Sequence, residues 1–318
     1  RAARAPRTGT PLPMLPADAG MLRRKLTPGA GREGTPALAF GGGARFAAAP
    51  GSSGAGGTLA VDVRGGGLEI LGPGQAPALA GPGVAVSADA LNALRPARMV
   101  LGGVIGASTQ ADALGAISLG GDSQRVLVRG GASLYAPEFV LLAPTNGNIT
   151  VEQGAVLSTV GMGAAPQDAR GGYYYSLQSN GALVLSNGLV NLRPPAQDGR
   201  VAIDIGACAG VCTGTTRLVS EGTIGAATNG AFTLRDNVEY GTRNLMLSVS
   251  GLNLGSPQAL AQAAAAGQLP PGLALDQDCP VYTSDAADAG LGGERRGRPR
   301  LTTQTTTRAA SRSRVKRQ

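Results

Sequence analysis

The sequence predicts an all-β protein and, within that class, favours a parallel β-solenoid over a sandwich or a barrel. Three observations support this prediction. Short apolar runs recur along the 318 residues, 51 Gly and 21 Pro punctuate them, and the chain has six Tyr, four Phe and no Trp. A core with so few aromatic rings must be built from aliphatic side chains, which suits a narrow, repetitive interior.

The apolar runs, separated by Gly, Asn, Asp and Pro, are the main secondary-structure signal. In many of them large apolar residues alternate with small or polar ones, as at Val61 and Val63 or Ile203 and Ile205, which is the period of a half-buried strand. We therefore expect strands at 58–63, 68–71, 98–101, 116–119, 125–128, 138–143, 148–151, 182–185, 189–192, 200–205, 216–219, 231–234 and 244–249.

A recurrent phrase, Gly-x-Ile or Gly-x-Leu, marks the turns between several of these runs. It begins at Gly115, Gly147, Gly181 and Gly222, with irregular insertions between the copies. Repetition with insertions of variable length is typical of a solenoid, at roughly 20 residues per coil. A sandwich does not require such a repeat, so the phrase favours the solenoid.

Two short helices are expected to interrupt the strands. The first runs from Ser87, which is placed to cap its first turn, to Pro96, which ends it. The second runs from Ser256 at the N-cap, through a proline at the first helical position, to Gly267 at the C-cap. We expect both helices to cover loops or ends of the solenoid.

Composition divides the chain into three parts. Residues 1–57 are rich in Gly, Pro and Arg and are expected to form a poorly ordered lead-in, residues 58–278 carry the strands, and residues 279–318 are expected to form a basic, disordered tail. Basic residues exceed acidic ones by seven to two in 1–34 and by nine to three in the tail. Because the formal charge of +8 resides in the two ends, we expect no nucleic-acid partner.

The absence of histidine excludes several classes of active site. A Ser/His/Asp triad, a Cys/His dyad and a histidine metal site are all impossible in this chain. We therefore expect a protein that is not an enzyme and that holds no cofactor and no metal ion. No segment is apolar enough for a membrane-spanning helix, and the first residues contain neither Met nor a signal-peptide core, so we expect a fragment of a longer protein.

Six carboxylates of the body could in principle pair across neighbouring coils for glycoside cleavage or calcium binding. The alternative is that they are solvated, outward positions between inward apolar neighbours, as Asp62 is between Val61 and Val63. The alternation favours this second interpretation. The six residues are Asp62, Glu69, Asp204, Glu221, Asp236 and Glu239.

Two short motifs are candidate sites. In Cys208-Ala-Gly-Val-Cys212 a structural disulfide competes with two free buried thiols and with a metal or redox role, and the missing further ligands favour the disulfide. The run Tyr173, Tyr174 and Tyr175 is the only aromatic cluster of the sequence. It is a candidate exposed contact for a carbohydrate or a partner, and the competing interpretation is a loop that packs back on the rod.

Four phrases of the body carry a family resemblance: Ser87-Ala-Asp-Ala-Leu-Asn-Ala-Leu-Arg-Pro96, Gly147-Asn-Ile-Thr-Val-Glu-Gln-Gly-Ala155, Leu218-Val-Ser-Glu-Gly-Thr-Ile-Gly225 and Tyr240-Gly-Thr-Arg-Asn-Leu245. Together they resemble the filamentous haemagglutinin family of large Gram-negative exoproteins, over roughly residues 58–275. The resemblance implies a right-handed parallel β-helix rod that is secreted through an outer-membrane transporter by two-partner secretion and acts as a surface adhesin. It assigns no role to an individual residue.

The tail carries a different resemblance. Cys279-Pro-Val-Tyr-Thr-Ser-Asp-Ala-Ala-Asp288, followed by Gly290-Leu-Gly-Gly-Glu-Arg-Arg296, resembles a translated transposase-type sequencing adapter, in which Leu-Leu usually stands in place of Pro280 and Val281. This resemblance implies that residues 279–318 are not part of the natural protein. The alternative is a genuine basic arm.

The resulting hypothesis is a structural and adhesive segment of a filamentous haemagglutinin-like virulence protein. Its rod would present loops for attachment to a host or neighbouring cell, or to its matrix, with glycans as candidate ligands. The expected location is the medium or the cell surface of a Gram-negative bacterium. Two alternatives stay open: a polysaccharide-active β-helix enzyme, with carboxylates and an arginine converging on one outer face, and a nucleic-acid-binding protein that uses its basic ends.

Overall fold

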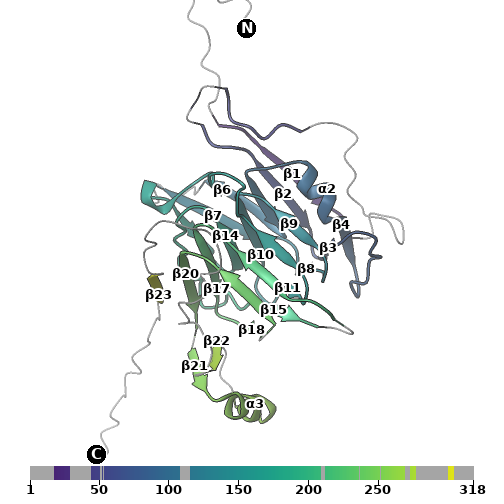
Figure 1. Cartoon of the computed structure of the whole chain (residues 1–318), viewed down its shortest axis with the longest axis vertical. Coiled ribbons are helices and arrows are strands. Elements are labelled where there is room, and N and C mark those ends of the chain that lie inside the picture. Colours follow the sequence, from purple (N-terminus) through teal and green to yellow (C-terminus); the bar gives the residue numbers. More distant parts are fainter. Residues whose placement is uncertain are drawn as a thin grey trace, which may run out of the picture.

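The computed structural model describes residues 18–28, 44–50, 52, 54–107, 115–208, 212–235, 237–250, 252–268, 273–276 and 300–303. These residues form an all-β protein, as predicted. The strands follow one another along the long axis of the molecule, from β2 near one end to β20 near the other (Figure 1). Within the described ranges, no helix is long and apolar enough to cross a membrane.

The first sheet contains eight strands among the described residues. Neighbouring strands are parallel except at β14, which runs antiparallel to both β10 and β17. Its order is β1 (Met21–Leu26), β2 (Thr58–Val63), β5 (Arg98–Leu101), β10 (Glu138–Ala143), β14 (Gly181–Ser186), β17 (Thr223–Thr228), β20 (Asn244–Val249) and β23 (Arg300–Thr303).

The second and third sheets are parallel throughout. The second has the order β21 (Leu252–Gly255), β22 (Leu273–Asp276), β18 (Phe232–Leu234), β15 (Ala202–Ala207), β11 (Asn148–Glu152), β8 (Arg125–Val128), β3 (Gly67–Leu71) and β4 (Gly83–Ser87). The third has the order β19 (Val238–Gly241), β16 (Thr216–Val219), β12 (Val156–Ser158) and β9 (Ser133–Tyr135).

The strand register shows a repeat with insertions. Thr58 of β2 pairs with Arg98 of β5, and Arg98 pairs with Glu138 of β10, so equivalent positions are 40 residues apart. Between β17 and β20 the corresponding distance, from Thr223 to Asn244, is 21 residues. The predicted spacing of roughly 20 residues is therefore seen only where no insertion intervenes.

Alternate side chains of the three sheets form one aliphatic core. Because successive residues of a strand point to opposite faces, each strand contributes every second residue. Most of these side chains are fully buried. They include Leu59, Val61, Leu68, Ile70, Met99, Leu101, Val126, Val128, Leu134, Phe139, Leu141, Ile149, Val151, Leu157, Ile203, Ile205, Leu218 and Ile224.

A small fourth sheet, here called the covering sheet, forms a second core on the outer face of the first sheet. It consists of β13 (Tyr174–Ser176), β7 (Ala116–Gly121) and β6 (Gly103–Ala107). Its side chains pack against the residues of the first sheet that point away from the main core. Strands β10 and β14 are consequently buried at every position, which explains their nearly continuous apolar sequences.

Strand β1 lies inside the predicted lead-in and corrects that prediction for Met21–Leu26. Leu22 and Leu26 pack against the main core, whereas Arg23 and Lys25 form ion pairs with acidic side chains of the body. The strand is half apolar and half basic, so its composition resembles that of the flanking linker. Only its pairing with β2 distinguishes it.

The two expected helices are present as α2 (Ala88–Ala93) and α3 (Pro257–Ala265). The Ser87 hydroxyl accepts a hydrogen bond from the Ala90 N–H at 3.4 Å, which is the predicted N-cap. The strand predicted at 189–192 does not form: this segment makes a single parallel bridge, between Leu192 and Tyr175, as it runs beside β13 at the edge of the covering sheet. Of the predicted tail, only Arg300–Thr303 falls within the described residues.

Candidate functional site

The tyrosine run lies on the covering sheet and is divided by strand alternation. Gly172, with φ of +83°, turns the chain out of a short 3-10 helix (Ala169–Gly171) into β13. Tyr175 then points into the second core and is 4% exposed, whereas Tyr173 is 44% exposed and Tyr174 is half-buried. The run thus combines an anchor with two displayed rings.

The anchor of the run ends in a buried polar cluster. Arg98 and Glu138 face each other because they are register partners in β5 and β10, and they are 2% and 0% exposed. Arg98 donates through Nε to Glu138 Oε1 and through Nη2 to Tyr175 Oη, the latter at 2.9 Å. Tyr175 Oη donates to Glu138 Oε1 at 2.6 Å. Ser186 Oγ and Gln167 Oε1 complete the cluster, on Glu138 and on Arg98 respectively.

The electrostatics of this cluster keep the Arg98 guanidinium charged and the Tyr175 phenol protonated. Burial opposes the charge of Arg98, but the Glu138 carboxylate outweighs it and raises the pKa of the guanidinium. Burial first, and then the Glu138 charge, raise the pKa of Tyr175 well above the usual value for a phenol. Tyr175 therefore acts as a hydrogen-bond donor and not as a base.

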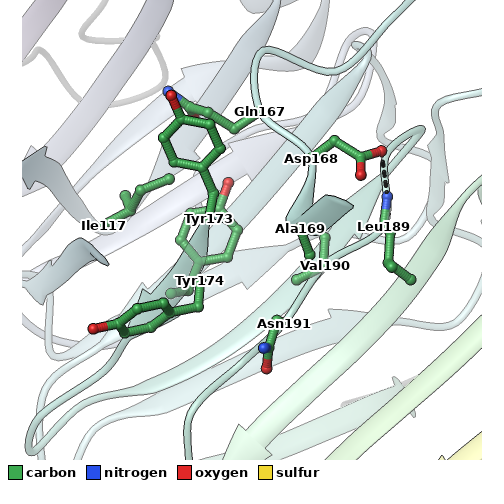
Figure 2. Close-up of a pocket in the computed structure, with 10 residues that line it drawn as sticks. Ile117, Gln167, Asp168, Ala169, Tyr173, Tyr174, Leu189, Val190 and Asn191 are labelled. Carbon is green, nitrogen blue, oxygen red and sulfur yellow. Dashed lines mark hydrogen bonds between the residues drawn. The ribbon is translucent and has the colours of Figure 1, made fainter. Parts of the chain in front are cut away.

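A shallow hollow lies beside the displayed rings. Figure 2 shows Tyr173 and Tyr174 on one side of it, with their hydroxyl groups directed apart, and Leu189 across from them. We call this site the tyrosine hollow. Its lining residues are Ile117, Gln167, Asp168, Ala169, Tyr173, Tyr174, Tyr175, Leu189, Val190 and Asn191.

The carboxylate at the edge of the tyrosine hollow already has partners. Asp168 accepts from Arg170 Nη2 at 2.8 Å and from the Leu189 N–H at 3.0 Å, the bond drawn in Figure 2. Hydrogen bonds from the Arg170 side chain outweigh partial burial and hold the pKa of Asp168 well below its usual range. Asp168 therefore holds the backbone of Leu189 in place at the edge of the hollow.

A cation borders the tyrosine hollow next to Tyr174. The guanidinium carbon of Arg193 lies 4.0 Å from the centroid of the Tyr174 ring, within cation–π range. Leu192 is buried, so Asn191 and Arg193 on either side of it are displayed at the surface. The hollow thus offers aromatic faces, an amide and a guanidinium.

Two of the six carboxylates considered above are buried, so the prediction that they are solvated is wrong for them. Asp62 is 0% exposed beneath Arg23 of β1, whose Nε donates to it at 2.9 Å. Glu69 is 1% exposed and accepts from Arg129 Nη1 at 2.7 Å and from two backbone N–H groups of the loop before β4. Both side chains point to the outer face of their strand, as the alternation predicts, but side chains from other segments cover that face.

The remaining carboxylates do not gather in one place. Asp236 lies outside the described residues, and the others are bonded singly: Asp204 to Arg235, Glu239 to Arg217, and Glu221 to the Gly161 N–H. Across the described ranges, no group of three His, Cys, Asp or Glu side chains is arranged to hold a metal ion.

Cys208 and Cys212 are joined by a disulfide, with Cα atoms 5.8 Å apart. The bond closes the loop that follows β15. This is the alternative that the sequence favoured, and with both sulfur atoms engaged in it neither cysteine is a thiol or a metal ligand. Cys279 lies outside the described residues.

Sequence reasoning missed Arg98, Glu138 and Arg193. Arg98 and Glu138 each open an apolar strand, 40 residues apart, and the same spacing separates Thr58 from Arg98. Alignment of the strand starts would have revealed the pair. No local signal marks Arg193, because its stacking on Tyr174 depends on the pairing of residues 191–193 with Tyr175 at the edge of the covering sheet.

The arrangement of the tyrosine hollow is suited to binding. Its polar groups can orient a ligand, but among the described residues that line it no nucleophile lies beside a base, and the carboxylate of Asp168 is held by Arg170. No protein-family model, curated protein or solved structure matches the chain. The family resemblance of the sequence phrases thus stays a prediction.

Proposed function

We propose that the chain is a right-handed parallel β-helix rod that serves as a structural and adhesive segment of a large, secreted filamentous haemagglutinin-like surface protein. The observation that carries the proposal is the stacking of β2, β5 and β10, in parallel and at equal 40-residue intervals. Further support comes from the path of the chain, which passes from the first sheet through the second and third sheets at β10, β11 and β12 and again at β17, β18 and β19, as in a solenoid.

The connections support the proposed right hand. A crossover between parallel strands of one sheet is right-handed in about 98% of cases. The path from β17 through β18 and β19 to β20 is such a crossover. A right-handed β-helix is therefore the architecture that these connections favour.

An adhesive role is supported by what the rod displays on its side. The insertions between stacked strands form the covering sheet and the tyrosine hollow, and two aromatic rings and a guanidinium face solvent there. In this proposal the surface of a host or neighbouring cell is the partner, and an outer-membrane transporter of the two-partner type exports the parent protein of a Gram-negative bacterium.

The enzyme alternative has less support. A polysaccharide-cleaving site needs two carboxyl groups flanking one bond. In the described part of the chain Asp62, Glu69 and Asp204 are each bonded to their own arginine, which favours a structural role for them. The nucleic-acid alternative depends on residues 1–34 and 279–318, most of which lie outside the described ranges.

The adhesive proposal is tested by attachment. Beads coated with the full chain are offered to epithelial and bacterial cell layers, and beads coated with the heat-unfolded chain serve as the control. We expect the folded chain to retain beads under washing and the unfolded chain to lose them. Equal retention of the two would overturn the proposal, as would no retention on any surface.

A further inference from the structure

We propose that the tyrosine hollow binds an acidic saccharide, that is, a sugar ring carrying a carboxylate. The inference deepens the adhesive function proposed above and rests on it, because a glycan of the attached surface would be the ligand. Three features of the site carry it: exposed aromatic faces, a cation without a carboxylate partner, and a rigid support.

The aromatic faces match the apolar face of a sugar ring. Tyr173 is 44% exposed, and Ile117, Leu189 and Val190 line the hollow beside it. The hollow is shallow, so it suits contact with one face of a single sugar ring of a longer chain and not enclosure of a whole ligand. The hydroxyls of Tyr173 and Tyr174 and the Asn191 amide lie at its rim and can donate to sugar oxygens.

The cation specifies the charge of the ligand. Arg193 is exposed and stacks on Tyr174, and within the described residues no carboxylate lies in ion-pair range of its guanidinium. The neighbouring Arg170, by contrast, is paired with Asp168. A planar guanidinium matches a carboxylate with two parallel N–H···O bonds, and stacking holds it in one orientation. Charge complementarity therefore favours an acidic sugar over a neutral one.

Hydrogen bonds hold the site in place, which reduces the conformational entropy that its side chains lose when a ligand binds. Tyr175 is anchored by Arg98 and Glu138, and the segment that carries Arg193 is tied to it, because the Arg193 N–H donates to the Tyr175 carbonyl at 2.9 Å. The segments that carry Tyr173, Tyr174 and Arg193 are therefore held together through Tyr175. Preorganised groups of this kind lose less conformational entropy when a ligand arrives.

The test is calorimetric titration of the full chain with trigalacturonate and with the neutral trisaccharide of galactose. We expect trigalacturonate to bind at least about tenfold more tightly, because it alone gains the charge-assisted bonds of Arg193. Arg193→Gln should abolish this preference, and Tyr173→Ala should weaken both sugars. Arg200→Gln and Tyr135→Ala are the matched controls, since Arg200 is exposed and Tyr135 is 42% exposed, and they should change neither affinity.

Circular dichroism establishes that each variant is folded before its titration is interpreted. The proposal is overturned if the folded wild-type chain does not bind trigalacturonate, if it binds the neutral sugar equally, or if Arg193→Gln keeps the preference. Bead attachment separates this failure from that of the adhesive function: attachment unaffected by Tyr173→Ala and Arg193→Gln refutes the saccharide site while adhesion stands. Loss of attachment in these variants alone supports both.

Discussion

At the scale of single residues, Arg98 and Glu138 form an ion pair in which both side chains are buried. It joins two neighbouring strands and, through Tyr175, fastens the covering sheet to them. Buried ion pairs add little stability over an apolar pair, but removal of one partner leaves an uncompensated charge. We therefore expect the loss of one partner to lower the free energy of unfolding far more than replacement of the whole pair by apolar residues.

Glu138→Gln should consequently destabilise the protein strongly. It leaves Arg98 buried without a counter-charge, which typically costs about 3–5 kcal/mol of the free energy of unfolding. Urea unfolding followed by circular dichroism measures the change. Glu239→Gln is the control, because Glu239 is 64% exposed in its pair with Arg217 and should change the free energy by under about 1 kcal/mol. Similar losses in the two variants would contradict this account.

Asp168 should contribute to stability in a pH-dependent manner. Its pKa is lowered in the folded protein, chiefly by the Arg170 side chain, so its contribution is fully present above the unfolded pKa of about 4. The contribution is lost as the pH falls from there through the lower folded pKa. Thermal melts between pH 7 and pH 2 should show that wild type loses more stability than Asp168→Asn. Parallel curves would exclude this role.

At the scale of elements, turns decide where strands can stack. Gly102, between β5 and β6, has φ of +90°, and a Cβ there would lie 2.2 Å from the Leu142 carbonyl oxygen and 2.3 Å from Val126 Cγ2. The chain leaves the first sheet at this point to form the covering sheet. A side chain would therefore force apart two neighbouring strands.

Gly102→Ala should destabilise the protein by about 3 kcal/mol or more, from overpacking together with the left-handed backbone. Gly74→Ala is a matched control: Gly74 has φ of +70° but open space around it, so only the backbone term of about 1 kcal/mol applies. The difference between the two melting temperatures isolates the steric part. A Gly102→Ala variant as stable as Gly74→Ala would show that the strands can separate without loss.

At the scale of the whole molecule, β1 protects the end of the first sheet. It pairs along the open edge of β2 and covers Asp62. Removal of residues 1–57 should lower the free energy of unfolding on the order of 3 kcal/mol, because apolar contacts are lost and a buried carboxylate loses its partner. Removal of residues 1–17 alone should have no such effect. Equal stability of the two truncated chains, measured by thermal melting, would contradict this role.

Much of the fold could be predicted from the sequence: the all-β class, most strand positions and both helices, with a disulfide between Cys208 and Cys212 as the favoured alternative. These features depend on residues close together in the chain, where alternation, caps and short spacings act directly. Strand β1 was missed because its three apolar and three basic residues do not alternate and resemble a linker until β2 lies beside it.

Which outward faces are buried depends on contacts that form in the folded protein. Asp62 and Glu69 have the alternation of solvated positions, yet distant segments cover them. The reversal of β14, the meeting of Arg98 with Glu138 and the stacking of Arg193 on Tyr174 likewise depend on insertions of different lengths. Periodicity predicts that a side chain points outward from its strand. Whether that side chain then meets solvent or protein depends on contacts between residues far apart in the chain.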